Sequence, residues 1–507
     1  MGRFSRGLFV TLWISLDLLA TPEDPAAAKQ HADKAADYVQ SGDLPHAEAE
    51  LHTAIRLAPA DSSYLTSLGA VLGMQGKLQE ANTYFERAVK ANPADATARR
   101  NLAANQWRLG ELKPAQANLE RLLRTQPQDS ASVLLLGMVS ENLHDYARAA
   151  KLLGSIPAIV AQRPETVAAL ASACYHTGQR EKAHRLLEGL LTQPAEPQGI
   201  FAAAGVAAQS GDFGIAEKLF ESIRASYPDR TKLAYNLALI QYRTGHTVES
   251  QQALLALVTA GRGTGEVYDL LGRCYQAQGK TSEAIHTLET AIHQDPSREP
   301  SYATLTAILI DAKRLPAALA AATEMTKVFP KSALAFLTEG QVQLKMSQYT
   351  DAVQAYRRSI ELDSSSLDAQ TGLASAQWGA GMRTEAQSSF ELLIKQYPRD
   401  ADLPETYATL LLDSAPDDVA ETHAATLLKA ALDLDPGRVE SHYRLGNLAL
   451  KNGSTGDALQ HLETAARLAP EESKIQFALA RLYRRLGRAD DATSAMSRYE
   501  KLKAAGK

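Results

Sequence analysis

Apolar residues recur at helical intervals in short blocks, which glycine and proline separate. In residues 265–298, Val267, Leu270 and Leu271 are spaced so that they fall on one face of a helix. Gly279 supplies the left-handed backbone conformation that often ends a helix. A second apolar run with the same spacing follows and stops before Pro296, which cannot continue a helix. This block therefore predicts two consecutive helices joined by a tight turn.

The same block repeats along most of the chain with a period of 34 residues. The period is seen in a column of small residues that is alanine everywhere except at Ser250. This column runs Ala47, Ala81, Ala115, Ala149, Ala183, Ala216, Ser250, Ala284, Ala318, Ala352, Ala386, Ala424, Ala458 and Ala492. Columns of proline and glycine keep the same register, so the chain holds about fourteen repeats. The alanine column, with small residues such as Gly272 opposite it, should let the paired helices approach closely.

The register is irregular in two places. A proline is late in the fourth repeat, at Pro164, and early in the fifth, at Pro194, which indicates a deletion near Gln193. The spacing from Ala386 to Ala424 is 38 residues, so four residues are inserted, and we place them around 413–418. We interpret these irregularities as altered turns and expect one continuous array over residues 28–504.

The composition favours helices and argues against several classes of function. The chain is 45% hydrophobic but only 6% aromatic, and it is rich in alanine and leucine. A net charge of -5 offers no basic field to nucleic acid. The sequence contains no Walker-type loop, no His-Glu-x-x-His and no Cys-x-x-Cys, so we expect no catalytic residues, no metal and no cofactor. Cys174 and Cys274 should lie too far apart to form a disulfide and should be buried.

The motif Tyr268-x-x-Leu271-Gly272-x-x-Tyr275, followed by Ala284-x-x-x-Leu288 and Pro296, resembles the tetratricopeptide repeat family, in its bacterial multi-repeat type. The resemblance implies an all-α fold, a right-handed α-α superhelix of about fourteen helix-turn-helix repeats. It also implies a binding role, because in this family the first helix of each pair lines a concave groove that grips peptides or a partner's helix.

Groove positions were carried over from the family to the first helices of this chain, where aromatic and arginine side chains are the usual binding hot spots. The residues predicted to contact a partner are Tyr235, Tyr242, Arg243, Asp269, Arg273, Tyr443, Asn447, Lys451, Arg481 and Arg484. Asn447 and Arg481 also resemble part of the family's carboxylate clamp. However, Phe477 stands where the clamp needs a cation, so solvated charges that cap the last repeat remain the alternative.

Residues 1–27 differ from the rest of the chain. Arg3 and Arg6 precede an apolar run from Leu8 to Leu16, which is the order of residues in a secretory signal. The run is short for a membrane span, and we expect membrane contact only through this segment. We therefore interpret residues 1–27 as a signal-like or anchor segment and expect export to the periplasm or cell envelope rather than a cytoplasmic location.

Three functions follow from these expectations. The first is a non-catalytic scaffold that binds partner peptides or helices, in a cell-envelope assembly or a secretion process. The second is a cytosolic regulatory or co-chaperone-like adaptor, for which the clamp-like residues would matter. The third is the repeat part of an enzyme complex, which would need a catalytic domain beyond the repeats.

Overall fold

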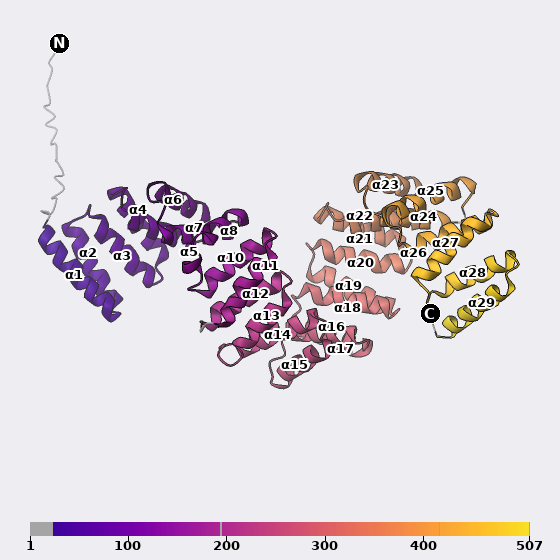
Figure 1. Cartoon of the computed structure of the whole chain (residues 1–507), viewed down its shortest axis with the longest axis horizontal. Coiled ribbons are helices and arrows are strands. Elements are labelled where there is room, and N and C mark those ends of the chain that lie inside the picture. The colour runs from indigo at the N-terminus through magenta and orange to yellow at the C-terminus, as the bar shows by residue number, and fades with distance from the viewer. Residues whose placement is uncertain (1–23, 193–194, 415, 506–507) are drawn as a thin grey trace, which may run out of the picture. The chain divides into compact units, whose positions relative to one another are not determined.

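The computed structural model describes residues 24–192, 195–414 and 416–505. Within these ranges it contains 29 α-helices, one short 3-10 helix and no β-strand (Figure 1). The expectation of an all-α fold is therefore confirmed. Residues 1–23, which carry most of the predicted signal segment, lie outside the described part of the chain. No helix among the described residues is long and apolar enough to cross a bilayer.

The chain divides into two compact units, Met1–His246 and Thr247–Lys507. The helices of the first unit are α1 (Pro25–Ser41), α2 (Leu44–Leu57), α3 (Ser62–Met74), α4 (Leu78–Ala91), α5 (Ala96–Arg108), α6 (Leu112–Thr125), α7 (Ser130–Asn142), α8 (Tyr146–Gly154), α9 (Pro157–Val160), α10 (Pro164–His176), α11 (Arg180–Glu188), η1 (Gly189–Thr192), α12 (Pro197–Gln209), α13 (Phe213–Ser222) and α14 (Arg230–Arg243).

The second unit continues the same alternation of helices. Its elements are α15 (Thr247–Thr259), α16 (Gly265–Ala277), α17 (Thr281–Gln294), α18 (Glu299–Asp311), α19 (Leu315–Val328), α20 (Ala333–Lys345), α21 (Tyr349–Leu362), α22 (Leu367–Gly379), α23 (Arg383–Gln396), α24 (Asp402–Asp413), α25 (Asp418–Leu434), α26 (Val439–Lys451), α27 (Thr455–Leu468), α28 (Ser473–Arg485) and α29 (Ala489–Ala504).

Taken in chain order, with the short α9 set aside, these helices supply a first and a second helix to each of the fourteen repeats that the 34-residue period predicts. The boundary between the two units falls within the seventh repeat, between α14 and α15. Each unit is a row of helix pairs in which successive pairs pack against each other. One continuous array over residues 28–504 stays a prediction.

In the thirteen repeats that lie within one unit, the column of small residues lies where the two helices pack together. All fourteen of its side chains, including Ser250, are at most 3% exposed. The opposing glycines are equally constrained, because a Cβ placed on Gly272 would lie 2.7 Å from Leu288 Cγ. At Gly446 the same atom would lie 2.6 Å from Leu462 Cγ. The close approach of the paired helices, expected from the sequence, is therefore confirmed.

The turn between the two helices of thirteen repeats uses the left-handed backbone region. The ten glycines of the glycine column have φ between 72° and 86°, as their role as helix stops predicts. Four repeats lack the glycine. In three of them the residues at this position are His144, Lys313 and Ser347, with φ of 61°, 56° and 59°. The turn of the twelfth repeat includes residue 415, which lies outside the described residues. The turn geometry is thus kept where the sequence does not favour it, because packing of the two helices imposes it.

The irregular spacings correspond to irregular helices. In the fourth repeat the second helix, α8, is short and α9 follows it as an extra helical turn. Pro164 occupies the first position of α10, so it opens a helix instead of closing the hairpin before it as the column suggested. The early Pro194 lies outside the described residues. In the twelfth repeat the insertion lengthens α25 to 17 residues, where α23 and α27 have 14.

The two cysteines are free and buried, as expected. Cys174 belongs to the first unit, and Cys274 belongs to the second, where its Sγ lies 3.3 Å from the hydroxyl of Ser250. They fill space in the core as small apolar side chains.

Candidate functional site

Three of the predicted partner-binding residues line one pocket in the second unit. Tyr443, Asn447 and Lys451 are spaced four residues apart on α26, so they lie on one face of this helix. The pocket has a volume of about 350 Å³. Its other walls are Leu412, Asp413, Pro416, Glu421, Arg444 and Leu448. The structure therefore brings together predicted residues from α26 with residues around the end of α24 and the start of α25.

The inserted segment builds one wall of this pocket. Asp417 caps α25 by accepting a hydrogen bond from the backbone N–H of Ala420, at 2.8 Å. Glu421, one turn further along α25, then reaches Lys451 on α26. The sequence located the insertion but did not predict its role. The 38-residue spacing between Ala386 and Ala424 was the signal in the sequence that could have indicated a pocket wall here.

A half-buried carboxylate fixes α26 beside α24. Glu405 on α24 accepts hydrogen bonds from Arg438, at 2.7 Å, and from both the backbone N–H and the hydroxyl of Ser441, at 3.1 and 2.6 Å. Burial alone would raise the pKa of Glu405, but these hydrogen bonds outweigh it and hold the pKa below its ordinary value. The position of α26, and with it one wall of the pocket, thus depends on an ionised Glu405.

The cations in the pocket are already paired. Arg444 Nη1 lies 2.8 Å from Asp413 Oδ1, and Arg444 Nε lies 2.6 Å from Glu440 Oε1. Burial lowers the pKa of Arg444, but the bonds to Asp413 and Glu440 more than reverse this and raise it. Lys451 pairs with Glu421. The pocket is therefore charge-balanced, and a partner's carboxylate would have to compete with these internal pairs.

The polar and aromatic groups of α26 are less constrained. Asn447 donates its amide N–H to the carbonyl of Tyr443 at 3.0 Å, and its side-chain oxygen accepts no hydrogen bond in the described part of the chain. The Tyr443 ring is half-buried, and Lys474 Nζ lies 5.1 Å from its centroid. These two residues present an aromatic surface and an open hydrogen-bond acceptor to the pocket.

Arg481 and Arg484 lie on α28, the first helix of the next repeat. Lys474 contacts Tyr443 near the start of α28, and Arg485 Nη1 donates to the carbonyl of Leu450 at 2.6 Å near its end. Residues of α28 thus lie beside those one repeat earlier on α26. Both Arg481 and Arg484 are exposed and have no hydrogen-bond or ion-pair partner among the described residues. Arg481 lies one 34-residue period after the pocket residue Asn447.

The carboxylate clamp stays a prediction. The register places Arg481 beside Asn447, as a clamp would need, and it places Phe477 beside Tyr443. Phe477 is 40% exposed, and its ring centroid lies 5.1 Å from that of Tyr499. This edge of the site is aromatic, where the clamp would have a second cation.

The other predicted residues divide between the two units. Tyr235, Tyr242 and Arg243 lie on α14 of the first unit, where both tyrosines are half-buried and Arg243 is exposed. Asp269 and Arg273 lie on α16 of the second unit. The α14 residues therefore belong to a different compact unit from the pocket on α26.

Asp269 is used inside the repeat stack. It is 3% exposed, it accepts a hydrogen bond from the hydroxyl of Ser301 at 2.8 Å, and its Oδ2 lies 2.9 Å from Arg273 Nε. The Arg273 Nε–H is not aligned for a hydrogen bond, so this contact is ionic. Since Ser301 belongs to the next repeat, Asp269 connects α16 to α18, and we leave its carboxylate out of the candidate site.

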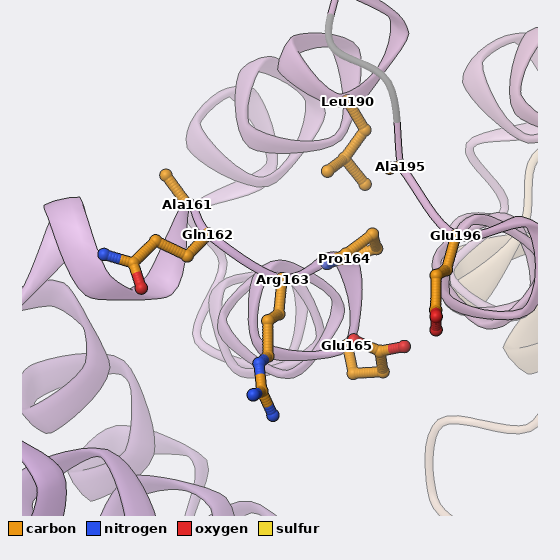
Figure 2. Close-up of a pocket in the computed structure, with 8 residues that line it drawn as sticks. All are labelled: Ala161, Gln162, Arg163, Pro164, Glu165, Leu190, Ala195 and Glu196. Carbon is orange, nitrogen blue, oxygen red and sulfur yellow. The ribbon is translucent and has the colours of Figure 1, made fainter.

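A second pocket, of about 500 Å³, lies in the first unit where the repeats are irregular (Figure 2). It is lined by residues 161–165 before and at the start of α10, by Leu190 of η1, and by Ala195 and Glu196 before α12. The Glu165 carboxylate lies against the first turn of α12, 2.5 Å from where a Cβ on Gly199 would be. The irregular proline spacing marks this place, but reasoning from a regular repeat predicted no pocket.

Comparisons with known proteins agree with the repeat pattern. Three models described as tetratricopeptide repeat match the chain. One matches residues 74–138, one matches residues 32–96, 201–263, 308–366, 337–401, 422–470 and 443–506, and one matches residues 267–300. The second of these models alone spans more than half of the chain.

Individual relatives are distant. The chain is 21% identical over 228 residues to tetratricopeptide repeat protein 8 of Caenorhabditis elegans, a match that covers 45% of this chain and 44% of that protein. The chain thus spans less than half the length of this curated relative. Among solved structures, yeast Tom70 is 16% identical with a TM-score of 0.42, covering 94% of this chain and 92% of that one. The Cut9–Hcn1 hetero-tetramer of APC/C matches with 14% identity and a TM-score of 0.39, covering 90% and 96%.

Proposed function

Because this chain belongs to the tetratricopeptide repeat family, we propose that it is a non-catalytic scaffold that binds segments of other proteins along the first helices of its repeats. We further propose that the pocket lined by Tyr443, Asn447 and Lys451 is part of the binding surface. The observation that carries this proposal is that the three residues, predicted from the family's groove positions, line a single pocket.

The chemistry of the pocket suits an extended peptide. Leu412 and Leu448 supply apolar walls, and Tyr443 adds a ring of the kind that anchors interfaces. The open oxygen of Asn447 can accept a backbone N–H from the peptide. Every part of this contact is non-covalent, which fits a scaffold.

Affinity capture with matched variants tests the proposal. The mature array is immobilised as wild type, as the double variant Tyr443→Ala with Asn447→Ala, and as Leu392→Ala, and the captured proteins are quantified by mass spectrometry. Leu392 is a suitable control because it is 63% exposed on α23, a second helix. We expect a set of partners that wild type and Leu392→Ala retain and the double variant loses. Equal recovery of every partner by all three chains would refute the proposed site, and turnover of a substrate by the purified chain would refute the non-catalytic role.

We also propose that the scaffold works outside the cytoplasm, in an assembly of the cell envelope. The support is the order of Arg3, Arg6 and the apolar run that follows them, which matches a secretory signal. N-terminal sequencing of the chain purified from separated cell fractions tests this. A mature chain that begins near Ala28 in the envelope fraction supports export, and an intact N-terminus in the cytosol would favour the adaptor role instead.

A further inference from the structure

Two histidines face each other within the thirteenth repeat. His442 lies on α26 and His461 on α27, and both side chains are half-buried. Their Nδ1 atoms are 2.9 Å apart, with ring centroids 5.2 Å apart and planes tilted by 46°. The other ring nitrogen of His442, Nε2, lies 3.1 Å from the carbonyl oxygen of Pro436. This pair lies outside the residues that line the candidate pocket.

The hydrogen bonds determine where the protons are. A carbonyl only accepts, so His442 Nε2 must carry a hydrogen to bond Pro436. Two ring nitrogens within hydrogen-bond distance cannot both carry a proton along the same line. In the neutral pair, His442 Nδ1 therefore holds a lone pair that accepts the Nδ1–H of His461. The chain thus holds a neutral imidazole nitrogen in a fixed direction.

We propose that this pair is a binding site for a divalent metal ion of the zinc class, held between the two Nδ1 atoms. Metal-bound histidines commonly donate their second ring N–H to a carbonyl, and His442 already does so to Pro436. Zinc bonds to imidazole nitrogen at about 2.0–2.1 Å, and two tetrahedral ligands then lie about 3.3 Å apart. The nitrogens therefore need to separate by roughly 0.4 Å from their 2.9 Å distance, which small side-chain rotations allow.

The proton balance of binding is simple. His461 exchanges its Nδ1–H tautomer for the Nε2–H tautomer, so both rings stay neutral and no proton is released. No group of three or more histidine, cysteine, aspartate or glutamate side chains suited to a metal exists in the described ranges, so the protein supplies two ligands here and water completes the coordination. Asp457 on α27 and Lys429 on α25 act on His461 with opposite charges.

Isothermal titration of the untagged full chain with zinc chloride tests the proposal. The informative variant is His461→Asn, because asparagine places an amide near the Nδ1 position and keeps a hydrogen bond to His442 while removing the metal ligand. We expect it to unfold at the wild-type temperature without zinc and to lose one zinc equivalent. His293→Asn is the control, because His293 is exposed on α17 and makes no hydrogen bond within the described ranges. It should bind as wild type does.

A second measurement needs no variant. Diethyl pyrocarbonate modifies free imidazole nitrogens, and peptide mass spectrometry resolves each histidine. Saturating zinc should lower the modification of His442 and His461 at least threefold and leave His293 unchanged. Unchanged modification of the pair, or the same zinc stoichiometry in His461→Asn and wild type, would overturn the metal site and leave the pair as a hydrogen bond only.

Discussion

Substitution of Gly272 by alanine tests the physical basis of the helix pairing. The added Cβ would lie 2.7 Å from Leu288 Cγ and 3.4 Å from the carbonyl oxygen of Ala284. Favourable contact between carbon atoms needs about 3.5–4.0 Å, so Leu288 must move by roughly 1 Å. Leu288 is fully buried, so it can move only by displacing other core side chains or the backbone. Overpacking of this kind costs about 1–3 kcal/mol, which exceeds the gain of roughly 0.5–1 kcal/mol from replacing glycine within a helix.

The matched control is Gly205→Ala. Gly205 also lies within a first helix, α12, but no atom lies within 4 Å of the position that its Cβ would occupy. Gly205→Ala should therefore stabilise the first unit by about 0.5–1 kcal/mol, the usual gain when alanine replaces glycine within a helix. Urea unfolding followed by circular dichroism gives the sign of the change in the free energy of unfolding. Hydrogen exchange with mass spectrometry shows whether the change in stability lies in α16–α17 or in α12–α13. If Gly272→Ala stabilises the chain as Gly205→Ala does, the close-packing argument is refuted.

Three other substitutions follow from the structure. Asp269→Ala leaves the fully buried hydroxyl of Ser301 and a partly buried cation without their partner, so it should destabilise the second unit by about 2 kcal/mol in urea unfolding. Lys313→Gly relieves a φ of 56° and should stabilise by about 0.5–1 kcal/mol, measurable as a higher midpoint. Burial raises the pKa of Glu405, but the bonds to Arg438 and Ser441 lower it further, so its pKa in the folded chain is below the ordinary glutamate value. The ionised carboxylate therefore contributes its full free energy of folding above the ordinary glutamate pKa. This contribution is lost as the pH falls through the pKa of Glu405 in the folded chain. Melting curves from pH 6 to pH 3 should show this loss, and Glu405→Gln should weaken it.

Much of the fold could be predicted from local signals. Gly279 ends a helix, Ala284 permits close approach and Pro296 prevents continuation, and each effect acts within a few residues of its cause. Such signals add up when they repeat at a fixed period, which is why the number of helix pairs agrees with the structure. His144 shows the limit, because its left-handed backbone is imposed by the packing of neighbouring helices and not by its own preference.

The candidate site was harder to predict, because its properties depend on which charges meet between repeats. The register placed Asn447 and Lys451 on one helix face, but it could not show that Glu421 neutralises Lys451. Asp269 occupies a groove position by register, and only the structure shows its carboxylate bonded to Ser301 of the next repeat. Pairing partners about 30 residues away in sequence are set by tertiary packing, which a repeat pattern does not encode.

Site-specific photo-crosslinking tests the central claim most directly. A benzophenone amino acid is placed at position 443 in one chain and at position 392 in another, and crosslinked partners are identified in cells that produce the chain. Position 443 faces the proposed binding pocket, and position 392 is exposed on a second helix. If the first helices bind partner segments, position 443 should crosslink to a defined peptide of a specific protein while position 392 does not. The same adducts from both positions, or adducts from position 392 alone, would contradict the account.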